Sequence, residues 1–405
     1  MPLFEEARAI ILNHVSTVGI ERLSILEAVG RILAEDVTAP WDLPRVTNSA
    51  MDGYALRAMD CAQQATLPIE GFIPAGGSLG TSLKPGTAAK IMTGAPMPEG
   101  ADTVVPVEDV TETEDGVCFP AGVKAGAHVR LRGEDVQAGE CVISRGTLLR
   151  PAEIGMLASF GKIFVSVYRP PRVAILATGD ELVEPGECLA EDRIINSNTL
   201  TLAAAIKELG AQPTLLGIAR DTPECTREKV LEGLKADVLI TSAGVSAGDR
   251  DFVRSVLEEL GAETLFCRVD IKPGRPTTFA LHGQTPVFCL PGNPVSTMVT
   301  FEELARPALL KMMGHHRVIK PLIEATLLTD LTKKRLGVLN FQRVSIEVRD
   351  GRYLARCSGD QNTGILKTMV QADALALLPE DLDSFKAGDK VYIHLLGGNV
   401  DMIPC

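Results

Sequence analysis

A loop of small residues follows a short apolar run near the middle of this 405-residue sequence. Residues 238–240 are typical of a buried strand, and the loop after them contains Ser242, Gly244 and Ser246. Because these side chains are small, the backbone N–H groups of the loop are free to bind an anion. Residues 250–260 have apolar side chains at helical spacing, so the loop leads to a helix N-terminus, which favours negative charge. The loop therefore predicts a phosphate site, although a strand-to-helix turn that binds nothing could have the same residues.

Carboxylates, cations and rigid turns follow the neighbouring predicted strands. The carboxyl ends of parallel strands meet at one edge of a sheet, where such folds bind their ligands. Each residue alone could serve as a helix cap or a loop residue, but five strand ends with such residues predict one shared site. In chain order, the residues are Asp180, Glu181, Arg220, Asp221, Asp251, Lys272, Arg275, Pro291, Gly292 and Asn293.

Composition argues against several classes of protein. The formal net charge is minus 12 with a single Trp, whereas a nucleic-acid binder needs a basic surface and aromatic platforms. No apolar run approaches the roughly 20 residues of a membrane span, and the N-terminus lacks the pattern of a secretory leader. Nine cysteines without a CxxC pair, and six histidines without metal-ligand spacing, predict neither disulfides nor structural zinc. We therefore expect a cytoplasmic protein that binds neither nucleic acid nor membranes.

The length predicts a multidomain α/β protein of two to four domains. Apolar side chains at helical spacing predict helices over residues 3–15, 25–33 and 151–160. Short β-like runs separated by Gly and Pro occupy the sequence between the second and third of these helices. The pattern predicts an N-terminal helical or linker domain, residues 1–42 plus 143–170, which is interrupted by an inserted β-rich domain, residues 43–142.

Strands and helices alternate from residue 171 to residue 318. This alternation predicts a three-layer α/β domain with a mostly parallel sheet and helices on both faces. Residues 319–405 contain short alternating strands, which favour a small C-terminal β-barrel or sandwich. The predicted strands of the α/β domain are residues 172–178, 214–219, 237–242, 263–269 and 285–290.

Seven segments of the chain resemble the MoeA family of molybdenum-inserting enzymes, which includes the E domain of gephyrin. The resemblance covers essentially the whole chain, and seven motifs in one order are far more specific than a single glycine loop. The segments are NSAMDGYA (48–55), residues 91–108, RLRGEDV (130–136), TGDEL (178–182), TSAGVSAGDRD (241–251), KPGRP (272–276) and PGNP (291–294).

The resemblance implies a molybdopterin molybdotransferase. Such an enzyme uses molybdate and adenylylated molybdopterin as substrates, requires Mg²⁺ and releases AMP. The resemblance also implies a homodimer, whose active site combines the binding domain of one subunit with the inserted β domain of the other. A molybdopterin adenylyltransferase would supply the substrate, and proteins that mature molybdoenzymes would receive the product.

The family motifs also imply which residues act in that site. The implied catalytic residues are Asp52, Thr93, Asp135, Glu181, Asp221 and Asp251. Arg130, Arg268 and Lys272 are implied to clamp molybdate, and Thr363 matches a hydroxyl position in the C-terminal domain.

The residue types suit cleavage of a phosphoanhydride, because that reaction requires charge on the phosphates to be neutralised. Lys272 and Arg275 would orient the anion, and a magnesium ion held by carboxylates would share its charge. The candidate metal ligands are Asp180, Glu181, Asp221 and Asp251. Which of them hold the metal and which position water stays open, and Asp52 could be only a turn residue.

Three residues depart from the family pattern. Ala243 stands where the family more often has glycine, which restricts the backbone if a positive φ is needed. Arg268 and Arg275 stand where lysine occurs in relatives, so a planar guanidinium with several directed N–H donors replaces a compact ammonium group.

Two other functions remain as alternatives. One is a nucleotide pyrophosphatase on the same binding fold, although its competence-induced relatives lack the segments at 48–55, 91–108 and 130–136. The other is a non-catalytic molybdopterin-binding scaffold. Insertion of tungsten instead of molybdenum is also open.

Overall fold

The computed structural model describes residues 1–77, 80, 82–244, 252–333 and 336–397. It divides the chain into two compact units. The first contains Met1–Arg22 and Ser166–Cys405, and the second contains Leu23–Val165. Strands β1 (Ile20–Ser24) and β13 (Phe164–Tyr168), where the chain passes from one unit to the other, pair with each other.

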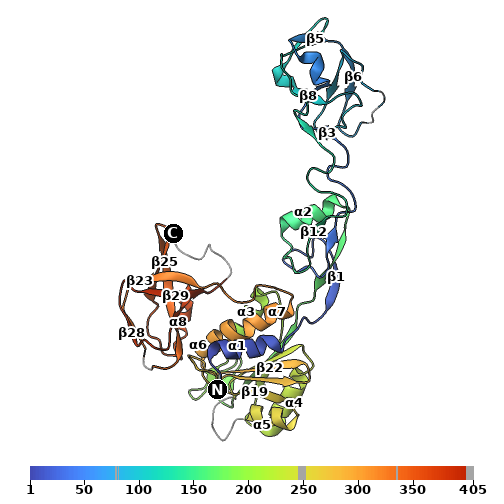
Figure 1. The fold of residues 1–405 in the computed structure, drawn as a ribbon. Coiled ribbons are helices and arrows are strands. Elements are labelled where there is room, and N and C mark those ends of the chain that lie inside the picture. The colour runs from blue at the N-terminus through green and yellow to red at the C-terminus, as the bar shows by residue number, and fades with distance from the viewer. Residues whose placement is uncertain (78–79, 81, 245–251, 334–335, 398–405) are drawn as a thin grey trace. The chain divides into compact units, whose positions relative to one another are not determined.

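A six-stranded sheet forms the centre of the first unit (Figure 1), in the order β17-β14-β18-β22-β21-β19. The first four strands in this order are parallel neighbours, β21 is antiparallel to β22, and β19 is antiparallel to β21. The predicted mostly parallel sheet is therefore confirmed. Strand β21 is the one strand of this sheet that the sequence pattern does not predict. The bounds are β14 Arg172–Thr178, β17 Gln212–Ala219, β18 Val238–Ser242, β19 Glu263–Phe266, β21 Thr278–His282 and β22 Thr285–Leu290.

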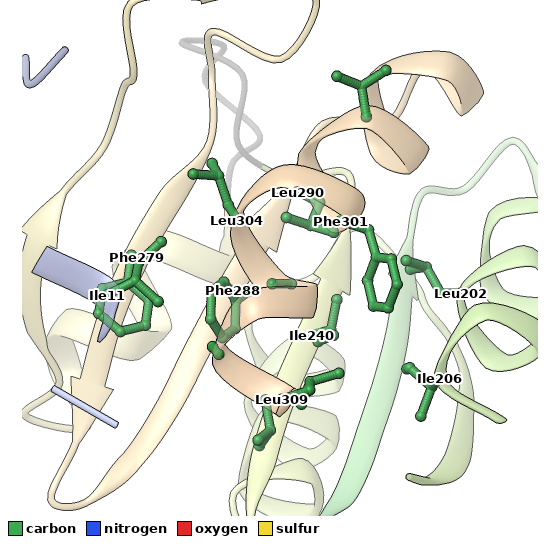
Figure 2. Close-up of a cluster of buried hydrophobic side chains, with 14 of the residues drawn as sticks. Ile11, Leu202, Ile206, Ile240, Phe279, Phe288, Leu290, Phe301, Leu304 and Leu309 are labelled. Carbon is green, nitrogen blue, oxygen red and sulfur yellow. The ribbon is translucent and has the colours of Figure 1, made fainter. Parts of the chain in front are cut away.

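Helices cover both faces of this sheet. Alternate side chains of β14 belong to two separate cores: Val173 and Ile175 pack with α1, α3, α6 and α7, whereas Ala174 and Leu176 pack with α4 and α5. Figure 2 shows the first core, where the helical segment with Phe301 lies over strands that contain Ile240 and Phe288. The three layers are therefore confirmed. The helices are α1 Phe4–Asn13, α3 Asn198–Glu208, α4 Pro223–Gly233, α5 Phe252–Glu259, α6 Pro294–Thr300, a π-helix Phe301–Ala305 and α7 Arg306–Met312.

Five strands close into a small barrel in the C-terminal part of the first unit. Their order is β25-β26-β23-β29-β27, and pairing of β27 with β25 closes the ring. This closure confirms the predicted barrel rather than the sandwich. Strand β20 (Ile271–Lys272), from the α/β part of the chain, pairs with β25 in parallel. The barrel bounds are β23 Ile323–Leu327, β25 Leu339–Arg349, β26 Arg352–Cys357, β27 Ala374–Leu378 and β29 Lys390–Leu395, with β24 Leu331–Thr332, β28 Ser384–Phe385 and α8 Lys367–Val370 beside them.

The barrel contacts the α/β layers through apolar and polar side chains. The rings of Phe4 in α1 and Phe341 in β25 meet edge to face with centroids 5.2 Å apart. Glu303 of the π-helix and His394 of β29 are both 2% exposed, and His394 Nδ1 lies 2.9 and 3.0 Å from the two carboxylate oxygens. A buried pair of this kind stabilises the contact only while both partners are present.

The second unit is rich in β-structure, as predicted. It contains a four-stranded sheet, β6-β7-β4-β8, and a three-stranded sheet, β5-β10-β9. Two further two-stranded sheets pair β2 with β12 and β3 with β11. The bounds are β2 Val37–Thr38, β3 Asn48–Ser49, β4 Gly53–Leu56, η1 Ala58–Cys61, β5 Ala65–Leu67, β6 Ile69–Ile73, β7 Ala88–Ile91, β8 Thr103–Pro106, η2 Val107–Asp109, β9 Thr111–Thr113, β10 Gly116–Phe119, β11 Val129–Arg130, β12 Cys141–Ile143 and α2 Pro151–Ser159.

The helix predicted over residues 25–33 is wrong. Residues 25–30 form turns, Gly30 has a φ of +78°, and Ile32 bridges to Leu148. Leu26 and Val29 are 76% and 47% exposed, so the apolar spacing does not mark a buried helical face. The helix predicted over residues 151–160 is confirmed by α2, whereas the four domain boundaries stay a prediction. Within the part of the chain that the structure describes, no helix has the length and apolar character to cross a membrane.

Candidate active site

A cavity of about 480 Å³ lies where β14, β18 and β22 end. Glu181 follows β14 by three residues, Ser242 and Gly244 lie at the end of β18, and the turn 291–293 follows β22. These are three of the five strand ends that the sequence predicts to converge. The strand that begins the α/β domain, β14, lies between its successors β17 and β18, so the cavity is at the point where the order of strands reverses. The cavity is lined by Glu181, Leu182, Ile194, Ile195, Asn196, Ser197, Asn198, Ser242, Ala243, Gly244, Pro276, Pro291, Gly292, Asn293 and Pro294.

The loop after β18 has a left-handed backbone at two consecutive residues. Gly244 has a φ of +76°, and a Cβ there would lie 2.7 Å from Val253 Cγ2. Ala243 has a φ of +73°, so this chain places an alanine where glycine is the less strained residue. The Ala243 N–H group donates to the Leu290 carbonyl at 3.1 Å, so Gly244 is the residue of this pair whose backbone N–H could bind an anion. Ser246 lies outside the described residues.

Asn198, at the start of α3, links two of the strand ends. Its Nδ2 donates to Ser242 Oγ at 2.8 Å and to the carbonyl oxygen of Gly292 at 2.7 Å. The loop after β18 and the turn after β22 are therefore held together by one side chain. The sequence pattern does not single out Asn198, because its position at a helix start already explains an asparagine.

Two of the predicted metal ligands lie next to each other. Asp180 Oδ1 accepts a hydrogen bond from the Asp221 backbone at 3.2 Å, and Asp221 Oδ2 accepts one from the Asp180 backbone at 3.4 Å. Arg220 donates to the Asp180 carbonyl at 3.2 Å and to the Leu182 carbonyl at 3.1 Å, and Arg193 also donates to Asp180. The ends of β14 and β17 thus present a pair of exposed or half-buried carboxylates, with Glu181 exposed beside them.

Carboxylate oxygens are the ligands that Mg²⁺ prefers, so Asp180 and Asp221 fit a magnesium ion in chemical type. Among the residues that the structure describes, no three His, Cys, Asp or Glu side chains gather as a metal-binding group. The fourth candidate ligand, Asp251, lies outside those residues.

The KPGRP segment lines a second cavity of about 300 Å³ together with Asn293 and Thr363. Lys272 and Arg275 both line it, and Arg275 Nε is buried without a hydrogen-bond partner among the described atoms. A buried donor without a partner is costly, so an anion in this cavity would satisfy it. Arg268 is exposed after β19 and lines neither this cavity nor the first.

The barrel positions residues at this second cavity in two ways. Strand β20 pairs Lys272 with Asn340 of β25, and Asn293 Nδ2 donates to Thr363 Oγ1 at 3.1 Å. Arg343, which is 1% exposed, donates to the carbonyls of residues 360, 361 and 362 at 3.0–3.3 Å and so holds the loop before Thr363. Arg343 is absent from the predicted site, because an arginine in an alternating strand pattern gives no signal of its burial.

The second unit contains the other predicted residues and brings two of them, Asp52 and Thr93, into contact. Asp52 Oδ1 accepts hydrogen bonds from Thr93 N at 2.6 Å and from Thr93 Oγ1 at 2.7 Å, and these bonds lower the pKa of Asp52. Arg130 pairs with Asn48 through the β11–β3 ladder. The carboxylate of Asp52 is exposed and ionised at neutral pH, as an acceptor or base would need to be.

The second unit also explains a motif glycine. A Cβ at Gly53 would lie 2.1 Å from the carbonyl oxygen of Val105, so no other residue fits beside β8. Asp135 is exposed and its backbone donates to the Leu43 carbonyl at 3.0 Å. Among the residues that the structure describes, no contact of the Asp135 side chain explains its place in the motif.

These features define a class of protein: an α/β domain with a cavity beyond its strand ends, together with a closed barrel and a β-rich unit. Three family models match the chain, the MoeA N-terminal region (domain I and II) at residues 3–161, the "Probable molybdopterin binding domain" at 174–311 and the MoeA C-terminal region (domain IV) at 324–396. The chain belongs to the MoeA family.

Curated relatives agree with this assignment over nearly the full length. A molybdopterin molybdenumtransferase of Haemophilus influenzae is 37% identical, with 93% of this chain and 95% of the relative covered. One from a Nostoc species is 36% identical, with 97% and 93% covered. The crystal structure of a molybdopterin biosynthesis MoeA protein from Pyrococcus horikoshii OT3 has a TM-score of 0.83 at 30% identity, with 98% and 100% covered.

Proposed function

We propose that this protein is a molybdopterin molybdotransferase of molybdenum cofactor biosynthesis. It would use adenylylated molybdopterin and molybdate, insert molybdenum at the dithiolene and release AMP. The observation that carries the proposal is the convergence of a left-handed glycine loop, a carboxylate pair and an arginine whose Nε has no partner among the described residues, all near neighbouring strand ends. The names of the relatives mention molybdopterin and molybdenum, which this geometry alone does not specify, and the adenylylated form of the substrate is part of the proposal.

The residues of the two cavities would bind different anionic groups. Gly244 in the left-handed loop and the turn at 291–293 would bind phosphate oxygens through backbone N–H groups, whereas the N–H of Ala243 is held by the Leu290 carbonyl. Lys272 and Arg275 would hold the second anion, with the planar fork of Arg275 supplying directed donors. Such preorganised donors stabilise the charge that develops when the phosphoanhydride is cleaved.

Asp180 and Asp221 would hold Mg²⁺, with Glu181 and Asp251 as the remaining candidates. A divalent ion at this position supplies neutralisation of phosphate charge and orientation of the leaving group. The hydrogen bonds between the backbone of each aspartate and the carboxylate of the other keep both side chains at the strand ends, which supports their joint role.

The remaining parts of the proposal rest on the family. The protein would act as a homodimer in the cytoplasm, with Asp52, Thr93, Arg130 and Asp135 of one subunit completing the site of the other. A molybdopterin adenylyltransferase would supply its substrate, and molybdoenzyme maturation proteins would receive its product. Exposure of Arg268 leaves its proposed contact with molybdate without support from the cavities.

The proposal is tested by measuring AMP release from adenylylated molybdopterin by the purified protein, with and without molybdate and Mg²⁺. Release should require both, and the product should reconstitute an apo-molybdoenzyme. Asp221→Ala should abolish this release while the protein remains folded, because one of the two adjacent carboxylates is lost. Glu263→Gln, an exposed change on the far edge strand β19, is the matched control and should keep full activity.

Two other results would replace the proposal. Hydrolysis of unrelated adenylates without molybdate would favour a nucleotide pyrophosphatase. Tight binding of the substrate without any release of AMP would favour a molybdopterin-binding scaffold.

A further inference from the structure

Asn196 is a buried polar residue that lines the first cavity. Its side-chain oxygen has hydrogen-bond partners, but its side-chain nitrogen has none among the described residues. Its side chain is 2% exposed and lines the cavity. Its Oδ1 accepts from the Thr199 hydroxyl at 2.8 Å and from the Thr199 backbone N–H at 3.3 Å. Its Nδ2 has no hydrogen-bond partner in the part of the chain that the structure describes.

The orientation of this amide is fixed by its partners. A backbone N–H can only donate, so the atom of Asn196 that faces Thr199 must be the oxygen. Exchange of the two amide atoms would place Nδ2 against that N–H group. The NH₂ group therefore faces away from Thr199, and a buried donor left without an acceptor carries a substantial desolvation cost. Native proteins keep such groups mainly where a ligand, ion or water satisfies them.

The surroundings of Asn196 select the kind of acceptor. Asn196 comes two residues before α3, an 11-residue helix whose N-terminus favours negative charge. Ser197 and Asn198, at that N-terminus, line the same cavity, and Asn198 contacts the loop at Ser242 and the turn at Gly292. A donor beside a helix N-terminus and across from an anion-binding loop suits an anionic oxygen better than a neutral acceptor.

We infer that Asn196 donates its Nδ2–H group to a phosphate oxygen of the bound substrate. Asn196 and the start of α3 then form one wall of a site whose other wall is the 242–244 loop and the 291–293 turn. The inference adds a substrate-binding residue to the proposed function and rests on that function for the identity of the substrate. Neither the glycine loop nor the carboxylate motifs include this residue.

The double role of Asn196 allows a substitution that separates binding from folding. Asn196→Asp keeps an oxygen that accepts from Thr199, so the start of α3 stays capped. The same change replaces the free donor by a carboxylate oxygen, which repels phosphate. Asn196→Ala removes both the cap and the donor. Leu200→Asp is the matched charge control, because it adds one negative charge to the first turn of α3 at a side chain that is 48% exposed and outside the cavity lining.

The experiment measures AMP and pyrophosphate binding by calorimetry and thermal unfolding of each variant. Asn196→Asp should remain folded, although a charge at this buried position lowers the unfolding temperature. It should bind both probes at least about tenfold more weakly, as expected for loss of a charge-assisted bond. Asn196→Ala should show a similar loss of affinity with a lower unfolding temperature. Leu200→Asp should bind within about twofold of wild type, because its charge is exposed and screened.

Binding by Asn196→Asp within twofold of wild type would overturn the inference, as would an equal loss of affinity in Leu200→Asp. The two proposals fail separately, because these probes report binding without turnover. Wild-type protein that binds AMP but never releases it from adenylylated molybdopterin would remove the transferase function and leave the role of Asn196 in phosphate binding intact.

Discussion

At the scale of single residues, the loop after β18 depends on the glycine at position 244, which has no side chain. A Cβ on Gly244 would lie 2.7 Å from Val253 Cγ2 and 3.0 Å from Thr178 Oγ1, and its φ of +76° disfavours any L-residue with a side chain. We expect Gly244→Ala to lower the free energy of unfolding by about 1–3 kcal/mol. It should also weaken AMP binding, because the backbone N–H groups of the loop must move. Urea unfolding and calorimetry measure the two effects.

Ala243 is the control for this prediction. It already has a φ of +73°, so Ala243→Gly removes strain of about 1 kcal/mol and adds a comparable entropy cost in the unfolded chain. Stability should therefore change little, and AMP affinity should be retained. Equal loss of affinity in Ala243→Gly and Gly244→Ala would mean that the left-handed geometry is not what binds the anion.

Individual residues show where sequence reasoning succeeds and where it stops. Asp180, Asp221, Asn293 and Lys272 are recognisable because they directly follow strands or lie in short motifs. Asn196 and Arg343 are not, because what distinguishes them is burial and an unusual count of hydrogen bonds. Those properties depend on packing between segments that are far apart in sequence, which a single sequence does not report.

At the scale of elements, parallel strands are predictable from apolar runs, but short pairings are not. Strands β14, β18 and β22 are buried apolar runs that end in turn residues, so their pattern suffices. Strand β20 has only two residues, and it exists because β25 of the barrel pairs with it. Residues 25–33 have helical spacing, yet Gly30 and the bridge from Ile32 to Leu148 give this segment a different structure. In both cases a distant segment decides the outcome.

The amino ends of the strands, opposite the candidate site, carry a charged cluster that makes stability depend on pH. Asp237, just before β18, accepts from both Nη atoms of Arg169 at 2.9 Å and from the backbone N–H of Arg172 at 2.7 Å. Burial alone would raise the pKa of Asp237, but these bonds outweigh it and hold the pKa below the usual value. The carboxylate therefore adds stability above the unfolded-state pKa near 4, which is lost as the pH falls through the lower native pKa.

We expect Asp237→Asn to be less stable than wild type by roughly 1–3 kcal/mol at pH 7, because a charge-assisted cluster is weakened. The difference should shrink as the pH falls below about 4, because the carboxylate becomes protonated first in the unfolded state and then, at lower pH, in the native state. Urea unfolding at pH 7, 5 and 3 measures it, with the exposed substitution Glu263→Gln as control. A difference that stays constant down to pH 3 would show that ionisation of Asp237 is not the cause.

At the scale of the whole molecule, the candidate residues fall into two compact units. Asp180, Asp221, Lys272 and the loop at 242–244 belong to the first unit, whereas Asp52 and Thr93 belong to the second. Each group is internally organised by its own hydrogen bonds, so each can be inactivated without disturbing the other. If the active site is shared between the subunits of a homodimer, a mixture of two variants, each with a defect in a different unit, should recover a calculable fraction of activity.

Mixing two inactive variants tests whether the site is shared between subunits. Asp52→Asn and Asp221→Ala should each abolish AMP release alone. If each site takes Asp52 from one subunit and Asp221 from the other, a heterodimer of the two variants contains one fully intact site and one doubly defective site. Half of the dimers in a re-equilibrated equimolar mixture are heterodimers, so activity should recover to roughly a quarter of wild type. If both residues of a site come from one chain, every site in the mixture carries one defect and no activity returns, which would refute the shared site. A mixture of Asp180→Ala with Asp221→Ala is the control that must stay inactive, because those two side chains meet within one unit.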